Sequence, residues 1–109
     1  MKTPPNNLEA EMCLLGSLLL DPQAIFKIID LVEIKDFYAI KHTHIYQTYQ
    51  EMFIAGEQID LVTLGEKLKS KNELEKIGGH SYLVQLTNTV PTASNIKQYA
   101  QVVKDKSLR

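Results

Sequence analysis

The chain has 109 residues, which is enough for one domain with a modest core. Its 12 basic and 13 acidic side chains nearly cancel, so no bulk charge attracts nucleic acid or an anionic membrane. Arg109 is the single arginine, whereas nucleic-acid readers rely on arginine for bidentate contacts with phosphate and guanine. The domain alone is therefore a poor candidate for DNA binding.

Cysteine usage and hydropathy limit the chain further. Cys13 is the single cysteine, which excludes an internal disulfide and a multi-cysteine metal site, and we expect it to pack as a small hydrophobe. The N-terminus has no signal-peptide pattern, and no stretch reaches the ~18 apolar residues of a membrane span. We expect a cytoplasmic protein without membrane contact.

The spacing of apolar residues predicts an all-α fold, a compact bundle of about six short helices. The first helix is predicted to begin at a capping box in which Asn6 is the cap and Glu9 reaches back. Gly16 lies in the middle of this helix, where glycine costs ~1 kcal/mol relative to alanine. That cost is tolerable if another helix crosses closely at this point.

Start and stop signals define the other five helices. Asp21-Pro22 predicts a second helix, and a third is expected from about His42 to Ala55, where Gly56 ends it. Asp60 is expected to cap a fourth helix. A fifth is predicted from about residue 79 to 87 and a sixth from about residue 92. The polar end, residues 104–109, looks like the middle of an element, so we expect the domain to continue into something else.

Few groups suggest a chemical site. His42 and His44 are the only histidine pair, but on a helix they point about 200° apart, so a solvated helix start is favoured over metal binding. Glu9 and Glu11 are also two residues apart, at a helix start where acidic side chains favour the dipole and the cap. The other interpretation of Glu9 is an exposed contact for a partner.

Glycine and tyrosine residues have both a structural and a functional interpretation. Gly78-Gly79 precedes a helix and could cradle an anion, but without a phosphate-loop sequence a backbone turn with positive φ is favoured. Tyr46, Tyr49 and Tyr99 lie on apolar helical faces, so we expect core residues whose hydroxyls reach the surface. Tyr82 follows the glycine pair and is expected to be partly exposed. No site for catalysis emerges.

Several segments taken together resemble the N-terminal part of DnaB-type bacterial replicative helicases. The resemblance runs from Pro4 to about Lys106, in order and with the familiar spacing. The segments that carry it are PPNNLEAE at 4–11, LLGS at 14–17, DFY at 36–38, HIY at 44–46, GEQIDLVTL at 56–64, LEKIGG at 74–79 and VPTA at 90–93.

The resemblance implies that residues 1–109 are the globular head of the helicase N-terminal domain, with no catalytic, metal or cofactor site of its own. A helical hairpin, a linker and a RecA-like motor that uses ATP and Mg²⁺ would lie outside this chain. The intact enzyme would be a hexameric ring that translocates on single-stranded DNA and unwinds the replication fork. The N-terminal domains would form a collar that pairs with itself and docks primase and, in some systems, a helicase loader.

By the same resemblance, Glu9 and Tyr82 match head positions suited to binding primase. Each retains its structural interpretation, as a helix cap for Glu9 and as partial core for Tyr82. Two other functions stay open. One is a stand-alone interaction adaptor, such as a loader or accessory factor with this fold and no motor. The other is direct single-strand binding by the head, which the near-zero net charge argues against.

Overall fold

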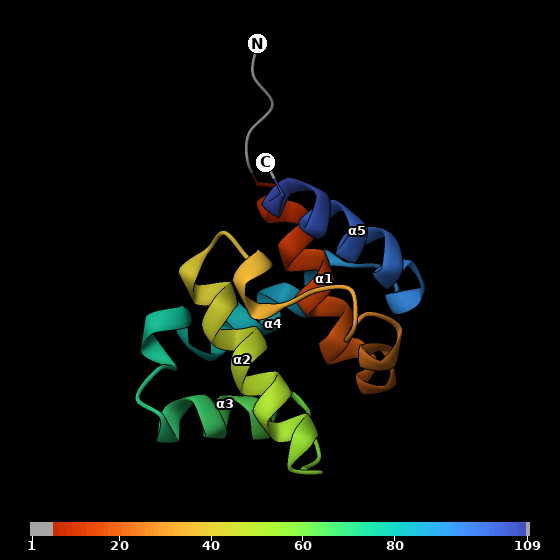
Figure 1. Ribbon diagram of the computed structural model, residues 1–109. Coiled ribbons are helices and arrows are strands. Elements are labelled where there is room, and N and C mark those ends of the chain that lie inside the picture. The colour runs from red at the N-terminus through yellow and green to blue at the C-terminus, as the bar shows by residue number, and fades with distance from the viewer. Residues whose placement is uncertain (1–5, 109) are drawn as a thin grey trace.

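A computed structural model describes residues 6–108 of the chain (Figure 1). This part is all-helical and contains no strand, which confirms the predicted fold class. Four short 3₁₀ helices connect or precede the longer helices: η1 (Pro22–Lys27), η2 (Ile34–Asp36), η3 (Glu75–Ile77) and η4 (Ala93–Asn95). The five α-helices are α1 (Leu8–Leu20), α2 (Ile40–Ile54), α3 (Leu61–Ser70), α4 (Gly79–Thr89) and α5 (Ile96–Ser107).

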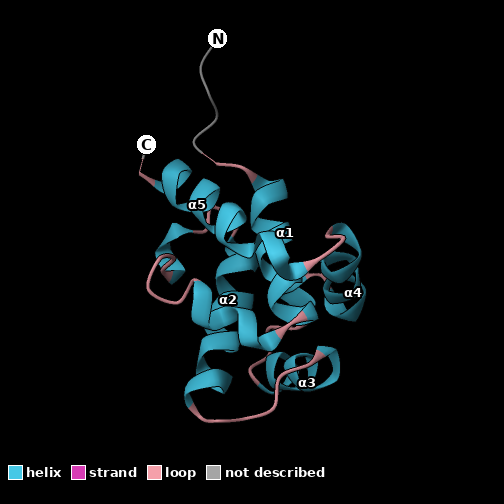
Figure 2. Cartoon of the chain, turned by 90° about the vertical axis from the view of Figure 1, so that its right-hand side faces the viewer, coloured by secondary structure: helices cyan, strands magenta, loops and turns pink. Residues whose placement is uncertain are grey.

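Helix α1 is the centre of the bundle. It packs most extensively against α4 and α5, the last two α-helices of the described residues, and also touches α2. Helix α3 packs on α2 and α4 at the end of the molecule opposite α5 (Figures 1 and 2). Leu14, Leu15 and Leu18 of α1 are buried at the middle of this core. The first helix therefore organises segments that lie far from it in sequence.

The helix starts follow side-chain capping, with one correction. Asn7 rather than Asn6 caps α1, because its side-chain oxygen accepts from the Ala10 N–H at 3.0 Å. The predicted capping box of Asn6 and Glu9 is therefore wrong: the third residue after the cap is Ala10, which has no polar side chain to complete the box. Asp60 caps α3 as predicted, accepting from the Thr63 N–H at 2.8 Å.

The second predicted helix is a 3₁₀ helix, η1, and not an α-helix. Asp21 caps it through the Gln23 N–H at 3.1 Å, and Pro22 occupies its start, as the sequence indicated. Ile28 follows η1 as its C-cap residue and donates its N–H to the Ile25 carbonyl at 3.1 Å, and both side chains are fully buried.

Gly16 allows α1 and α4 to cross closely, as the sequence predicted. A Cβ atom at this position would collide with the carbonyl group of Leu86 in α4, reaching its carbonyl carbon at 2.9 Å. Backbone atoms cannot move aside as cheaply as a flexible side chain. The helix-propensity cost of Gly16 is therefore offset by a contact that only glycine permits.

The glycine turns also behave as expected. Gly56 ends α2 with a φ of 73°, and the pair Gly78-Gly79 has φ values of 107° and 75°. These left-handed conformations favour glycine. The Gly78-Gly79 turn connects η3 to α4 and sets the direction in which α4 leaves it.

The tyrosines of α2 are core residues, as predicted. The prediction that their hydroxyls reach the surface is wrong. Tyr46 donates to the Val32 carbonyl at 2.9 Å, and Tyr49 donates to the Leu18 carbonyl at 2.8 Å, both in buried positions. Burial raises the pKa of Tyr46 to about 12 and also raises the pKa of Tyr49. The two hydroxyls thus satisfy backbone carbonyls of neighbouring segments inside the core.

A buried aspartate fastens η2 to the last turn of α5. Asp36 accepts hydrogen bonds from the Glu33 N–H at 2.8 Å, the Lys104 ammonium at 3.1 Å and the Ser107 hydroxyl at 2.7 Å. Burial by itself raises the pKa of Asp36, but these hydrogen bonds and the Lys104 charge outweigh it and hold the pKa below its ordinary value of 3.8.

Candidate partner interface

Three side chains from three helices form a hydrogen-bonded chain inside the domain. Glu11 of α1 lies with its Oε1 atom 2.7 Å from Nδ1 of His42 in α2, and Nε2 of His42 lies 2.5 Å from the hydroxyl of Tyr82 in α4. Glu11 and His42 are 2% and 1% exposed, so this contact is shielded from water. Because the carboxylate accepts from Nδ1–H, Nε2 is left to accept from the tyrosine hydroxyl.

Glu11 of α1 also caps the start of the neighbouring helix α2. Its carboxylate accepts from the Tyr38 N–H at 2.8 Å and from the Ala39 N–H at 3.3 Å, next to the first turn of α2. A negative charge at a helix N-terminus is favoured by the unpaired N–H groups and the helix dipole. Ala39 has no side-chain cap of its own, so Glu11 supplies one from α1.

The structure corrects the predicted environment of His42. His42 is buried and not solvated, and it faces Glu11 and Tyr82 with its two ring nitrogens. His44 lies elsewhere, with its Nδ1 atom 3.3 Å from the Glu73 carboxylate. The described residues include no cluster of three ligand side chains that could hold a metal ion.

Tyr82 is more buried than the sequence suggested, with 8% of its surface exposed. Burial, and to a lesser degree the charge of Glu11, raises the pKa of Tyr82 to about 12. Its hydroxyl is thus a poor nucleophile and serves to hold His42 in place. One face of its ring lies beneath the Lys41 ammonium, which is 3.9 Å from the ring centroid.

Glu9 lies in a different environment from Tyr82. It is an exposed residue in the first turn of α1, where an acidic side chain favours the helix dipole. With Asn7, Cys13 and Tyr99 it lines a shallow groove of about 270 Å³ between α1 and α5. Burial, with a smaller contribution from Glu9, raises the pKa of the Cys13 thiol, as expected for a packed hydrophobe.

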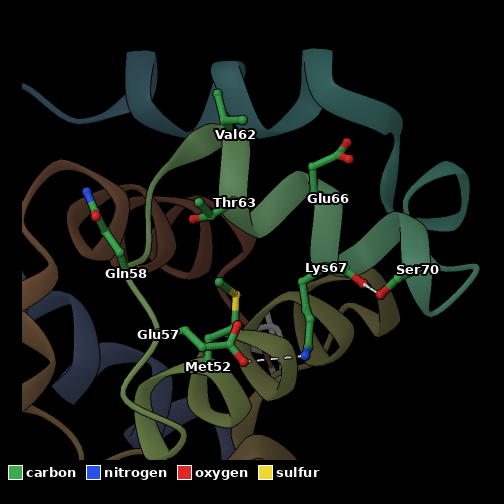
Figure 3. Close-up of a pocket in the computed structure, with 8 residues that line it drawn as sticks. All are labelled: Met52, Glu57, Gln58, Val62, Thr63, Glu66, Lys67 and Ser70. Carbon is green, nitrogen blue, oxygen red and sulfur yellow. Dashed lines mark hydrogen bonds and ion pairs between the residues drawn. The ribbon is translucent and has the colours of Figure 1, made fainter.

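The groove between the end of α2 and α3 is larger but is not built for chemistry (Figure 3). It has a volume of about 550 Å³. Lys67 pairs with Glu57 across it at 3.5 Å, and the Ser70 hydroxyl donates to the Lys67 carbonyl at 2.7 Å. The Thr63 hydroxyl oxygen accepts a hydrogen bond from the Asp60 N–H at 2.8 Å. These polar groups are paired, and the lining adds one further charged side chain, the exposed Glu66.

The roles of Glu11 and His42 were missed by the sequence analysis, although a signal was present. Glu11 lies four residues before Leu15 and seven before Leu18, and is therefore on the buried face of α1. His42 has the same relation to Tyr46 and Tyr49 in α2. Polar residues in register with a buried face indicate partners across the core.

Within the described residues, no helix has the length and apolar character that crossing a membrane requires.

The family model that describes the N-terminal domain of DnaB-like helicases matches residues 3–105. The chain is 40% identical over 107 residues to the replicative DNA helicase DnaC of Bacillus subtilis. It is 39% identical over 107 residues to the replicative DNA helicase DnaB of Geobacillus stearothermophilus. Each alignment covers 98% of this chain and 24% of the relative, so the chain spans about a quarter of the length of these curated relatives.

Among solved structures, two examples resemble nearly all of this fold. The N-terminal domain of DnaB helicase from Mycobacterium tuberculosis superposes with a TM-score of 0.94 at 38% identity, covering 97% of this chain and 74% of that chain. A DnaB-like replicative helicase, determined together with its interactions with primase, superposes with a TM-score of 0.83 at 30% identity. That match covers 93% of this chain and 24% of the larger one.

Proposed function

Because this chain belongs to the family of DnaB-like helicase N-terminal domains, we propose that it is the globular head of a ring-shaped replicative helicase. The main support for this proposal is the close superposition on the N-terminal domain of DnaB helicase from Mycobacterium tuberculosis. Both curated relatives named above are replicative helicases, which favours this function over a motorless adaptor. The cytoplasmic replisome at the bacterial nucleoid is then the place where the protein works.

In this proposal the full protein is as long as its relatives, and this chain is about a quarter of it. ATP hydrolysis and DNA translocation belong to the other three quarters. The head supplies structure and docking, in agreement with its nearly balanced charge and single arginine. The motor would carry the ATP and Mg²⁺ site and the single-strand contacts. Self-association of the heads, as dimers within a hexameric collar, would help to hold the ring.

We assign primase docking to a surface that includes Glu9 and Tyr82. The support for Glu9 is that its carboxylate is exposed and has no ion-pair partner among residues 6–108. Tyr82 presents only a small part of its surface, so its contribution combines a ring contact with the positioning of neighbouring groups. A helicase loader is a further candidate partner of the same collar.

The docking proposal is tested by titrating this 109-residue chain with the primase encoded in the same genome and measuring heat of binding. We expect saturable binding that Glu9→Ala weakens without changing the melting temperature. Tyr82→Phe is the appropriate second variant, because Tyr82→Ala would empty a buried site and cost several kcal/mol of stability. Failure of the wild-type chain to bind primase would refute docking by the head.

The parent activity is tested separately by reading the gene beyond codon 109. A helical hairpin followed by a phosphate-loop sequence, G-x-x-x-x-G-K-[ST], supports an ATP-driven helicase. A stop codon directly after this segment would instead favour the adaptor.

A further inference from the structure

The apolar anchoring of α5 stops about one turn before the helix ends. Its buried side chains are Ile96, Ala100 and Val103, each at most 2% exposed. Residues 104–107 complete the helix and are all polar, and Leu108, which follows them, is 73% exposed. No buried apolar side chain therefore holds the last turn of α5 on the bundle.

Asp36 of η2 holds this last turn instead. Two of the hydrogen bonds that its carboxylate accepts come from the end of α5, from the Lys104 ammonium at 3.1 Å and from the Ser107 hydroxyl at 2.7 Å. Asp36 is 6% exposed, so water competes weakly for these bonds. We call these three residues, Asp36, Lys104 and Ser107, the α5 clasp.

Both donors of the α5 clasp have a second acceptor within reach. The Ser107 hydroxyl lies 2.9 Å from the Lys104 carbonyl oxygen in its own helix and can donate to it instead. The Lys104 ammonium lies 3.6 Å from the carboxylate of Glu33, whose side chain is 62% exposed. If the last turn lifts away, both donors keep an acceptor and water reaches Asp36. Opening leaves no buried polar group unpaired, so it costs far less free energy than unfolding the domain.

Protonation does not open the α5 clasp at neutral pH. Burial opposes the charge of Asp36, but its hydrogen bonds and the charge of Lys104 outweigh burial and hold the pKa of Asp36 below 3.8. The carboxylate is therefore ionised at pH 7 and accepts strongly from both donors. The α5 clasp responds to a displacement of the end of α5, and not to a change of pH in the neutral range.

We infer that the α5 clasp is a latch that decides where the chain pivots as it leaves the head. When the latch is closed, residues 104–107 belong to the rigid bundle and the pivot lies at Leu108 or later. When it is open, the last turn unwinds back to Val103, which the core holds, and the pivot moves there. In the proposed helicase, this shift would widen the range of positions that the head can take relative to the rest of the ring. That consequence rests on the proposed function, whereas the latch is a property of this chain.

Hydrogen exchange of the 109-residue chain at pH 7, resolved to single amides by NMR, tests the latch. In the wild type we expect protection from exchange to extend to Ser107. Asp36→Asn should raise the exchange rates of residues 105–107 about tenfold, because the charged acceptor of the clasp is lost. The rates of α5 residues up to Val103 should stay unchanged, which distinguishes local opening from unfolding of the whole domain.

Asp105→Asn is the matched control for this change. It neutralises an exposed carboxylate in the same turn of α5, one that accepts from the Gln101 side chain at 2.8 Å within the helix. Because this carboxylate makes no bond to η2 among the described residues, its loss should change the exchange rates less than about twofold.

Ser107→Ala tests the sign of the effect. Alanine has a higher helix propensity than serine, so an end of α5 without a clasp would become better protected in this variant. With the clasp, the variant loses the hydroxyl that donates to Asp36. The exchange rates of residues 105–107 should then rise several-fold in spite of the gain in propensity.

Three results would overturn the inference. The first is unchanged exchange in Asp36→Asn with slower exchange in Ser107→Ala. The second is wild-type exchange of residues 105–107 at the rate of an unstructured peptide, which would mean that the latch is not closed in solution. The third is a uniform rise along α5 in Asp36→Asn, which would make Asp36 a support of the whole fold. None of these results bears on the proposed function, which the gene sequence and the primase titration test separately.

Discussion

Replacing Glu11 with alanine should cause one of the largest losses of stability available in this domain from a single polar residue. The change removes the acceptor for two N–H groups at the start of α2 and for Nδ1 of His42. Hydrogen bonds to a charged group contribute about 1.5–3 kcal/mol each, but the three share one carboxylate and are not additive. We therefore expect a loss of roughly 3–5 kcal/mol, a large part of the 5–15 kcal/mol typical of a domain.

Urea denaturation followed by circular dichroism measures this loss directly. Glu9→Ala is the matched control, because it removes a carboxylate from the same turn of α1 at an exposed position and should change stability by less than about 0.5 kcal/mol. If Glu11→Ala cost less than about 1 kcal/mol, water or a rearranged side chain would be replacing the carboxylate. The interpretation of Glu11 as the cap of α2 would then be wrong.

Three further predictions follow from the packing and from the shifted pKa values. Gly16→Ala should destabilise by roughly 1–3 kcal/mol in urea, because the collision with Leu86 exceeds the ~1 kcal/mol gain in helix propensity; unchanged stability would mean that α4 moves away cheaply. The lowered pKa of Asp36 stabilises the fold fully above its ordinary value of 3.8, and this contribution disappears as pH falls through the lower folded pKa. Below pH 3.8, wild-type stability should therefore fall more steeply than that of Asp36→Asn, and parallel curves would contradict the hydrogen-bond account. Cys13, whose pKa burial raises, should react with a thiol reagent slowly in the native state and quickly in denaturant; fast native labelling would show that the α1–α5 contact opens readily.

The positions of the helices could be predicted from the sequence because their signals are local. Asp60, Gly56 and the Gly78-Gly79 pair act through their own backbone or the next few residues, and each appears where predicted. The winding of η1 could not be predicted in this way. Its residues show a helical pattern, but residues three apart share one face in an α-helix and in a 3₁₀ helix alike, so the pattern does not choose between the two.

The register of Glu11 and His42 with buried helix faces indicates that they are buried, but it does not identify their partners. Glu11, His42 and Tyr82 are distant in sequence and meet only when α1, α2 and α4 pack. The family resemblance identified the fold and selected Tyr82, but the sequence left this side chain open between partial core and exposed contact, and the structure shows it to be 8% exposed. Exposure, which decides how a contact residue can act, came from the structure.

The position of α1 has a consequence for synthesis on the ribosome. This helix is made well before α4 and α5, which cover its apolar face. At 5–20 residues per second, about 90 residues must follow α1 before α5 is complete, a delay of roughly 5–20 s. During that interval Leu14 and Leu18 lack their final neighbours. A ribosome stalled before α5 would therefore expose the apolar face of α1 in the nascent chain to chaperones and proteases.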